Sequence, residues 1–312
     1  MKNLFRREYI MNYKSTKAGD KVFNTFNAIF MIVIVVVTLY PFLNILAISF
    51  NNASDTLKGG IYIWPREWTL FNFRSIFATG FLYHAFFISV LRTVISTVLN
   101  LFFTTMLAYT LSRKEYFLRK FITTVFVLTM YFSAGLIPSY FLIKNLGLMN
   151  HFIVYILPSM IGAFNLIVIR TYIKSLPDSM IEAAKIDGAG EFSIFIKIVF
   201  PLCKPVLAVV GLFVAVGAWN TWFDTFIYAS SNQNLSTLQY ELMKLLSTSM
   251  QTATSAVAQF GGKGALSGST DSVTPQSIRA ASTVVAALPI LMIYPFLQKY
   301  FVVGLNVGSV KE

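Results

Sequence analysis

Cysteine and histidine are almost absent from this chain. Its 312 residues include one cysteine, Cys203, and two histidines, His84 and His151. A single cysteine cannot form an internal disulfide framework. Two isolated histidines without nearby ligand residues make neither a metal site nor a catalytic triad. We therefore interpret Cys203 as a small buried hydrophobe and the histidines as membrane-interface residues, and expect neither a metal centre nor enzymatic activity.

Charged residues are also scarce, at 12% of the chain, whereas hydrophobic residues make up 56% and aromatic residues 16%. The mean hydropathy is +0.66. A water-soluble fold cannot bury that much apolar surface, so lipid must be part of the solvent. The composition predicts an all-α, multi-pass membrane protein.

Acidic residues are fewer than basic ones, 13 against 25. Such a balance is also typical of nucleic-acid binding, but here the charges lie between apolar runs rather than along one face. Membrane topology explains this distribution, and we expect no nucleic-acid partner. Seventeen Lys and Arg residues fall on one side of the predicted spans and seven on the other. The positive-inside rule then places both termini in the cytoplasm of a cell-membrane protein.

Six apolar segments are long enough to cross a bilayer, which takes roughly 20 residues. They are 26–50, 83–111, 118–143, 152–173, 205–228 and 280–301. The first is too long for the apolar region of a signal peptide, so we expect a retained helix. We divide the chain into a cytoplasmic segment, a first helix with its outer loop, a core transmembrane domain and a cytoplasmic tail. These parts are 1–24, 25–82, 83–301 and 302–312.

The inner loop 175–201 carries the most specific signal. Pro177 is placed to start a helix, and Ser179 with Glu182 three residues later matches a capping box. Gly188 and Gly190 are suited to end that helix in a left-handed turn. A second short helix should follow over 191–199. The loop therefore predicts a cytosolic helix-turn-helix knob, with Ala183 and Ala184 as a small face that docks in another protein.

The residues of this loop resemble the EAA motif of ABC importer permeases. That pattern is EAA, three residues, G, nine residues, I, one residue, then LP. The matching residues are Glu182, Ala183, Ala184, Gly188, Ile198, Phe200 and Pro201, with Phe200 where Leu is usual. The wider chain is similar to the carbohydrate branch of the family, including the smaller maltose-importer permease and the LplC/YtcP-like permeases. Segments 59–65 and 300–311 carry that likeness.

The resemblance implies a type I importer permease of six transmembrane helices with the MetI-like fold. It also implies a second permease subunit, two cytosolic ATPase subunits, an external solute-binding protein and an oligosaccharide substrate. ATP and Mg would bind in the ATPase subunits and no cofactor in this chain, which has no phosphate-binding G-x-x-x-x-G-K-[ST] sequence. Coupling to ATP is implied for Glu182, Ala183, Ala184, Asp187, Gly188, Ile198 and Pro201.

The substrate pathway is predicted at two places. Arg92 in the second span is costly in lipid, so it should face a cavity, a carboxylate or another subunit. Trp219, Asn220, Trp222 and Asp224 mix aromatic faces with polar groups, a combination that suits a sugar and equally suits a membrane interface.

Two alternatives stay open at this point. An ion-coupled secondary transporter and a non-transporting membrane scaffold subunit would also show long apolar spans. The outer segment 61–68 is rich in aromatic residues and suits either the membrane interface or contact with an external partner. The outer loop 231–278 is rich in Ser, Thr, Ala and Gly, and its composition assigns it no role.

Overall fold

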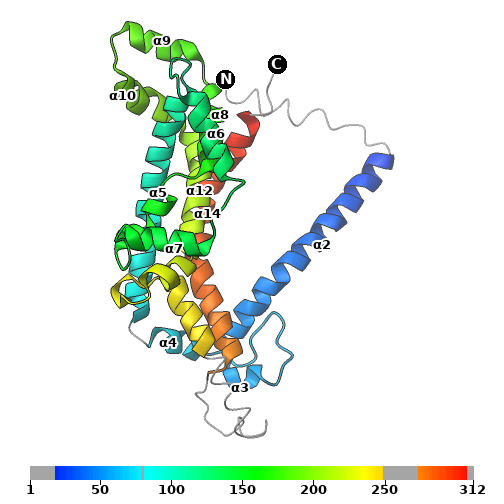
Figure 1. The fold of residues 1–312 in the computed structure, drawn as a ribbon. Coiled ribbons are helices and arrows are strands. Elements are labelled where there is room, and N and C mark those ends of the chain that lie inside the picture. Colours follow the sequence, from blue (N-terminus) through cyan, green and yellow to red (C-terminus); the bar gives the residue numbers. More distant parts are fainter. Residues whose placement is uncertain (1–17, 79–80, 249–272, 308–312) are drawn as a thin grey trace.

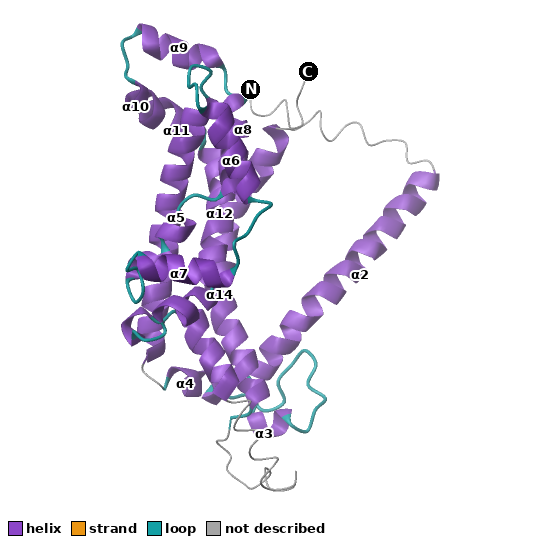
Figure 2. Cartoon of the chain, in the orientation of Figure 1, coloured by secondary structure: helices purple, strands orange, loops and turns teal. Residues whose placement is uncertain are grey.

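Helices dominate the computed structural model, which describes residues 18–78, 81–248 and 273–307. No strand is present in these ranges, where the one β feature is an isolated antiparallel bridge between Asn51 and Trp68. Figure 2 shows the helices joined by short loops. The all-α prediction is confirmed for the described residues. The N-terminal segment 1–17 and the end of the tail, 308–312, lie outside them, as does half of the outer loop 231–278, residues 249–272.

Two uninterrupted helices match the first two predicted spans. They are α2 (Ala18–Ser49) and α5 (Phe81–Ser112), each of 32 residues. Both are long and apolar enough to cross a membrane. Neither Gly nor Pro interrupts α5, so its backbone hydrogen bonds continue unbroken. The last helix, α14 (Pro275–Val307), contains the whole of the sixth predicted segment.

The third predicted span, 118–143, is not one helix. Its residues form α6 (Arg119–Thr129) and α7 (Leu136–Asn145), separated by six non-helical residues. Gly135 precedes α7 with φ +84°, a conformation that interrupts an α-helix and that glycine adopts without strain. The prediction of a continuous helix was wrong because it counted apolar residues and gave this glycine no weight.

The fourth and fifth predicted spans are bent or broken. Residues Phe152–Ser159 make an angle of 51° with α8 (Ala163–Lys174). The fifth span, 205–228, is broken where α12 (Lys204–Asn220) ends at Asn220, before a π turn over Thr225–Ala229. Just before this span, α12 meets the segment Glu191–Leu202 at 79°. Within the described ranges, length and composition therefore identify two spans, or up to four if each bent pair is one. Six spans are not established by this criterion.

The bundle is built around α5, which packs against α12 and α8 (Figure 1). A Cβ atom on Gly211 of α12 would come within 3.1 Å of the Leu101 side chain of α5, so the two helices approach closely at this glycine. Helix α2 contacts α14 near its outer end and diverges from the bundle toward its N-terminus (Figure 1).

Candidate coupling loop and outer pocket

The loop 175–201 forms a knob at one end of the bundle, beyond the ends of α5 and α8 (Figure 1). It contains α9 (Asp178–Ile186) and α10 (Glu191–Ile194). The predicted second helix, 191–199, is present but does not stop before Pro201. It continues as a π turn, Phe195–Val199, into α11 (Phe200–Leu202). The two-helix knob is therefore as predicted, apart from the length of its second arm.

The helix ends in this loop differ from the predicted caps. Pro177 is the N-cap of α9 and no side chain caps the helix, so the predicted box of Ser179 and Glu182 was wrong. Because the helix already begins at Asp178, Ser179 lies inside its first turn. Gly188 has φ +78°, as predicted for a left-handed turn. Gly190 instead has φ −70° and ψ 154°, and serves as the N-cap of α10.

The two alanines of the motif point in different directions. Ala184 is buried with Ile181 in the core of the bundle, where Phe195 also packs. Ala183 is exposed, as are Glu182 and Asp187. The expectation of a shared docking face for Ala183 and Ala184 was therefore wrong, because adjacent helical residues project about 100° apart.

Ile186 is a functional candidate that the sequence analysis missed. It is 87% exposed, on the same open side of α9 as Glu182. The sequence could have indicated it, because Ile186 follows Glu182 by four residues and residues four apart share a helix face. Glu182, Ala183, Ile186 and Asp187, followed by the turn at Gly188, make up the exposed edge of the knob.

Polar contacts fasten the knob to the membrane helices. The Tyr109 hydroxyl near the end of α5 donates to Glu191 Oε2 at 2.5 Å, and Lys185 Nζ lies 2.7 Å from Glu191 Oε1. Lys114 Nζ lies 3.2 Å from Asp178 Oδ2. The hydrogen bonds from Lys185 and Tyr109 hold the pKa of Glu191 below its usual value, against the opposing effect of burial. Helix α10 thus contacts the C-terminal end of α5 through Glu191, and α9 contacts Lys114, two residues beyond that end.

The last two motif residues lie away from the exposed edge of α9. Ile198 is half-buried and packs against the bundle core. Pro201 lies in α11, the continuation of the second arm, where it donates no backbone hydrogen bond. Their positions fit a role in connecting the knob to α12.

Arg92 meets a carboxylate of the same chain. Its side chain is 4% exposed and forms an ion pair with Asp224, while Nη1 donates to the Thr221 carbonyl at 3.1 Å. The guanidinium carbon also lies 4.7 Å from the centre of the Tyr155 ring. The sequence predicted that Arg92 faces a cavity, a carboxylate or another subunit. Of these three, the structure shows a carboxylate, that of Asp224.

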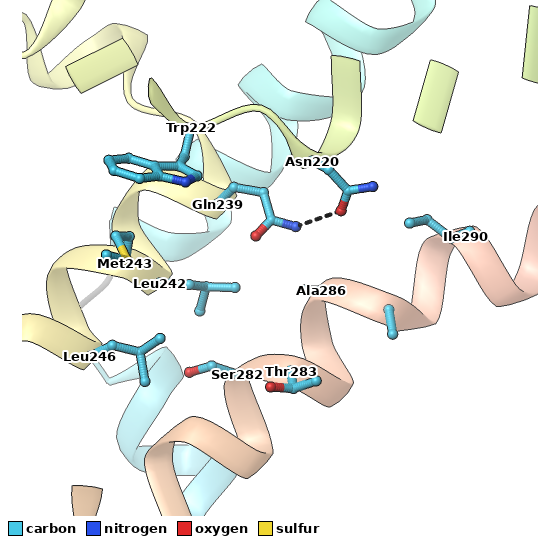
Figure 3. A pocket seen from close by; sticks show the side chains of 11 residues that line it. Asn220, Trp222, Gln239, Leu242, Met243, Leu246, Ser282, Thr283, Ala286 and Ile290 are labelled. Atoms are coloured by element: carbon cyan, nitrogen blue, oxygen red, sulfur yellow. Dashed lines mark hydrogen bonds between the residues drawn. The ribbon is translucent and has the colours of Figure 1, made fainter. Parts of the chain in front are cut away.

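A pocket of about 390 Å³, which we name the outer pocket after its predicted side of the membrane, lies at the C-terminal end of α12 (Figure 3). It is an open pocket lined by the residues around the end of α12, by the helix over 238–248 and by α14. The lining residues used below are Asn220, Trp222, Gln239, Leu242 and Ser282. Gln239 Nε2 donates to Asn220 Oδ1 at 3.4 Å. Ser282 is 3% exposed, and its hydroxyl has no hydrogen-bond partner among the described residues.

The pocket brings together some of the predicted pathway residues and excludes others. Asn220 and Trp222 line it, whereas Arg92 and Asp224 do not. Trp219 is 6% exposed, and its indole N–H donates to the Ala286 carbonyl at 2.9 Å. It is therefore a packing residue between α12 and α14. Gln239 and Ser282 were missed because they come from elements distant in sequence.

Comparison with known proteins gives matches over nearly the whole chain. Protein LplC of Bacillus subtilis is 37% identical, over 95% of this chain and 97% of its own. The polygalacturonan/rhamnogalacturonan transport system permease protein YtcP of B. subtilis is 34% identical, over 90% and 96%. A solved bacterial ABC transporter for the import of the acidic polysaccharide alginate has a chain with a TM-score of 0.79 and 26% identity, covering 92% of this chain and 99% of that one.

A family model, described as binding-protein-dependent transport system inner membrane component, matches residues 102–305. This match includes the knob, Asp224, which pairs with Arg92, and all the residues that line the pocket. The chain therefore belongs to that family, and it is a membrane-embedded permease component of an ABC transporter.

Proposed function

We propose that this permease moves an oligosaccharide, delivered by an external solute-binding protein, across the cell membrane. The observation that carries the proposal is the full-length similarity to YtcP and to the alginate importer, because both are named for the transport of sugar polymers. The importer would contain a second, related permease and two cytosolic ATPase subunits. ATP and Mg would bind in the ATPase subunits.

The outer pocket supports a carbohydrate cargo. Trp222 and Leu242 offer apolar surface, while Asn220, Gln239 and Ser282 offer neutral hydrogen-bonding groups. A sugar ring has apolar C–H faces and a rim of hydroxyls, so a mostly apolar pocket with a few polar groups matches its chemistry. The unpartnered hydroxyl of Ser282 gives a specific atom for a sugar hydroxyl to contact.

The exposed edge of the knob is the proposed ATPase contact. Glu182, Ala183, Asp187 and the turn at Gly188 would dock in a cleft of one ATPase subunit, with Ile186 supplying the apolar contact. When the ATPase dimer closes, the knob would be displaced, and its bonds to α5 would carry that motion into the bundle. The permease would then alternate between inward-open and outward-open states.

The proposed topology has six membrane crossings with both termini in the cytoplasm. Helices α2, α5 and α14 would each cross once, and the broken segments beginning at Arg119, Phe152 and Lys204 would supply the other three. The excess of Lys and Arg on the side that carries the knob supports this orientation.

An uptake assay tests the proposed function. Cells lacking this chain should lose uptake of a labelled oligosaccharide derived from polygalacturonan or rhamnogalacturonan and regain it with the wild-type chain. Depletion of ATP should stop uptake, whereas dissipation of the ion gradients at constant ATP should not. Uptake that follows an ion gradient would instead support a secondary transporter, and unchanged uptake in the deletion strain would rule out a role in carrying these sugars.

A further inference from the structure

The outer loop after α2 folds back beside that helix. Asn44 Nδ2 donates to the carbonyls of Ile61 and Tyr62, at 2.8 and 2.9 Å. Ile61 is 8% exposed and packs in a cluster with Ala47 and Ile48 of α2. Because Asn44 precedes the end of α2 by five residues, the loop reaches about 7 Å back along the helix at 1.5 Å per residue. We name residues 61–68 the aromatic finger.

A buried asparagine fixes the base of the aromatic finger. Asn51 is fully buried, and its Oδ1 accepts hydrogen bonds from the backbone N–H groups of Arg66 and Glu67 at 2.8 and 2.9 Å. Its Nδ2 donates to Thr56 Oγ1 at 3.0 Å and to Asp55 Oδ2 at 3.2 Å. Every polar atom of this side chain is therefore used to hold the loop.

Two further side chains close the base. Arg66 Nε lies 2.9 Å from Asp55 Oδ2, and its Nη2 donates to the Gly59 carbonyl at 2.7 Å. Asn72 of α4 (Phe71–Phe77), also fully buried, donates to the carbonyls of Ser49 and Asn51. The conformation of the aromatic finger is thus set by its own hydrogen bonds before any partner is bound.

The finger presents large apolar side chains that the rest of the described chain leaves exposed. Trp64 is 71% exposed, Tyr62 66%, Trp68 59% and Ile63 55%. The rings of Trp64 and Trp68 pack edge to face with centroids 5.3 Å apart. A clustered apolar surface on a fixed scaffold indicates an interaction site.

The position of the finger identifies the bilayer as its partner. The apolar stretch Gly19–Ser49 has 31 residues, about 46 Å of helix at 1.5 Å per residue, against a hydrocarbon core of about 30 Å. The outer end of α2, with Asn44 and the finger beside it, therefore falls in the headgroup region. Trp and Tyr are favoured there.

We propose that the aromatic finger is a membrane-binding element, with Tyr62, Trp64 and Trp68 inserted between the headgroups of the outer leaflet. It fixes the depth of the outer end of α2. This proposal does not depend on the identity of the transported sugar, because it rests on the geometry of the outer loop and on the proposed orientation of α2.

Fluorescence quenching by brominated lipid tests the proposal. The full chain is placed in nanodiscs of phosphatidylcholine and phosphatidylglycerol, with or without phosphatidylcholine brominated near the carbonyl end of its acyl chains. The chain has four tryptophans, at 64, 68, 219 and 222. Wild-type emission should be quenched, and the Trp64→Phe/Trp68→Phe variant should lose most of the quenched intensity. Quenching that is unchanged in this variant would overturn the proposal.

A second measurement uses the assembled importer and distinguishes lipid from a protein partner. Ile63→Cys, labelled with an environment-sensitive dye, should be quenched by brominated lipid and protected from aqueous iodide. The native Cys203 is buried and stays unlabelled. The control Glu115→Cys, 65% exposed in the loop after α5 and outside the exposed edge of the knob, should show no lipid quenching. Strong quenching of the label at position 63 by iodide would place it in water and contradict membrane insertion. A label quenched by neither iodide nor brominated lipid would place it against a protein partner and also contradict membrane insertion.

Discussion

Arg92 and Asp224 form an ion pair between α5 and the turn that follows α12, across 132 residues of sequence. The same arginine donates to the carbonyl of Thr221, the residue between Asn220 and Trp222. Both neighbours line the outer pocket. The pair therefore holds the segment that shapes the pocket, and Arg92 acts as a positioning residue without reaching the pocket itself.

Removal of either member of the pair should destabilise the protein strongly. Arg92→Leu leaves the Asp224 carboxylate without its cation, and breaking a buried pair in this way costs about 3–5 kcal/mol. We expect a lower melting temperature in detergent for Arg92→Leu and for Asp224→Leu. The double variant should be more stable than the sum of the two losses predicts, because no unpaired charge remains. Strict additivity would show that the two residues act independently.

The sequence predicted each member of this pair but not the pairing. Arg92 was expected to face a carboxylate or a cavity because of its cost in lipid, and Asp224 was expected in the pathway. Nothing in spacing or periodicity connects residues so far apart. The pocket was missed in part for the same reason, since Gln239 and Ser282 come from other helices.

Gly188 and Gly190 provide a matched test of the coupling loop. A Cβ on either residue would meet no atom within 4 Å, so steric clashes do not distinguish them. Only Gly188 has a left-handed conformation, in which an alanine costs about 1–2 kcal/mol. Gly188→Ala should therefore reduce uptake and substrate-stimulated ATPase activity in the assembled importer, while Gly190→Ala keeps both near wild type. Equal effects of the two substitutions would contradict a role for the turn.

Acidification should loosen the knob from α5. Because its pKa is lowered in the folded protein, Glu191 contributes stability at pH values above the usual glutamate pKa, and loses it as the pH falls through the lowered value. The melting temperature should fall between about pH 5 and pH 3, and Tyr109→Phe should make that fall smaller. A pH dependence identical to wild type in Tyr109→Phe would show that this hydrogen bond does not shift the pKa.

Asn51→Ala should loosen the outer loop. The substitution leaves the backbone N–H groups of Arg66 and Glu67 without their acceptor, at about 1–3 kcal/mol for each unsatisfied group. Limited proteolysis should cut within 57–70 much faster than in wild type. Asn234→Ala, at an exposed site, is the matched control and should leave the cleavage rate unchanged. If Asn51→Ala is cleaved within 57–70 as slowly as wild type, the base of the aromatic finger keeps its structure without this side chain.

The sequence predicted the membrane spans that are single continuous helices, but not the breaks within the other spans. Helices α2 and α5 follow from unbroken apolar sequence, but Gly135 and the sharp bend before α12 depend on local backbone geometry that hydropathy does not record. In the knob, the left-handed turn at Gly188 followed from its sequence position. The direction of Ala184 did not, because burial depends on which side of α9 meets the bundle.

The contact between the knob and an ATPase subunit is the most direct test of the proposed transport mechanism. The tagged chain is purified from its membrane with its partners, after cysteine crosslinking of Ala183→Cys or of Ala184→Cys. The account predicts co-purification of a second permease and an ATPase subunit, with a crosslink to the ATPase from exposed position 183 and little from buried position 184. Intact complexes without an ATPase subunit, or no crosslink from position 183, would contradict it.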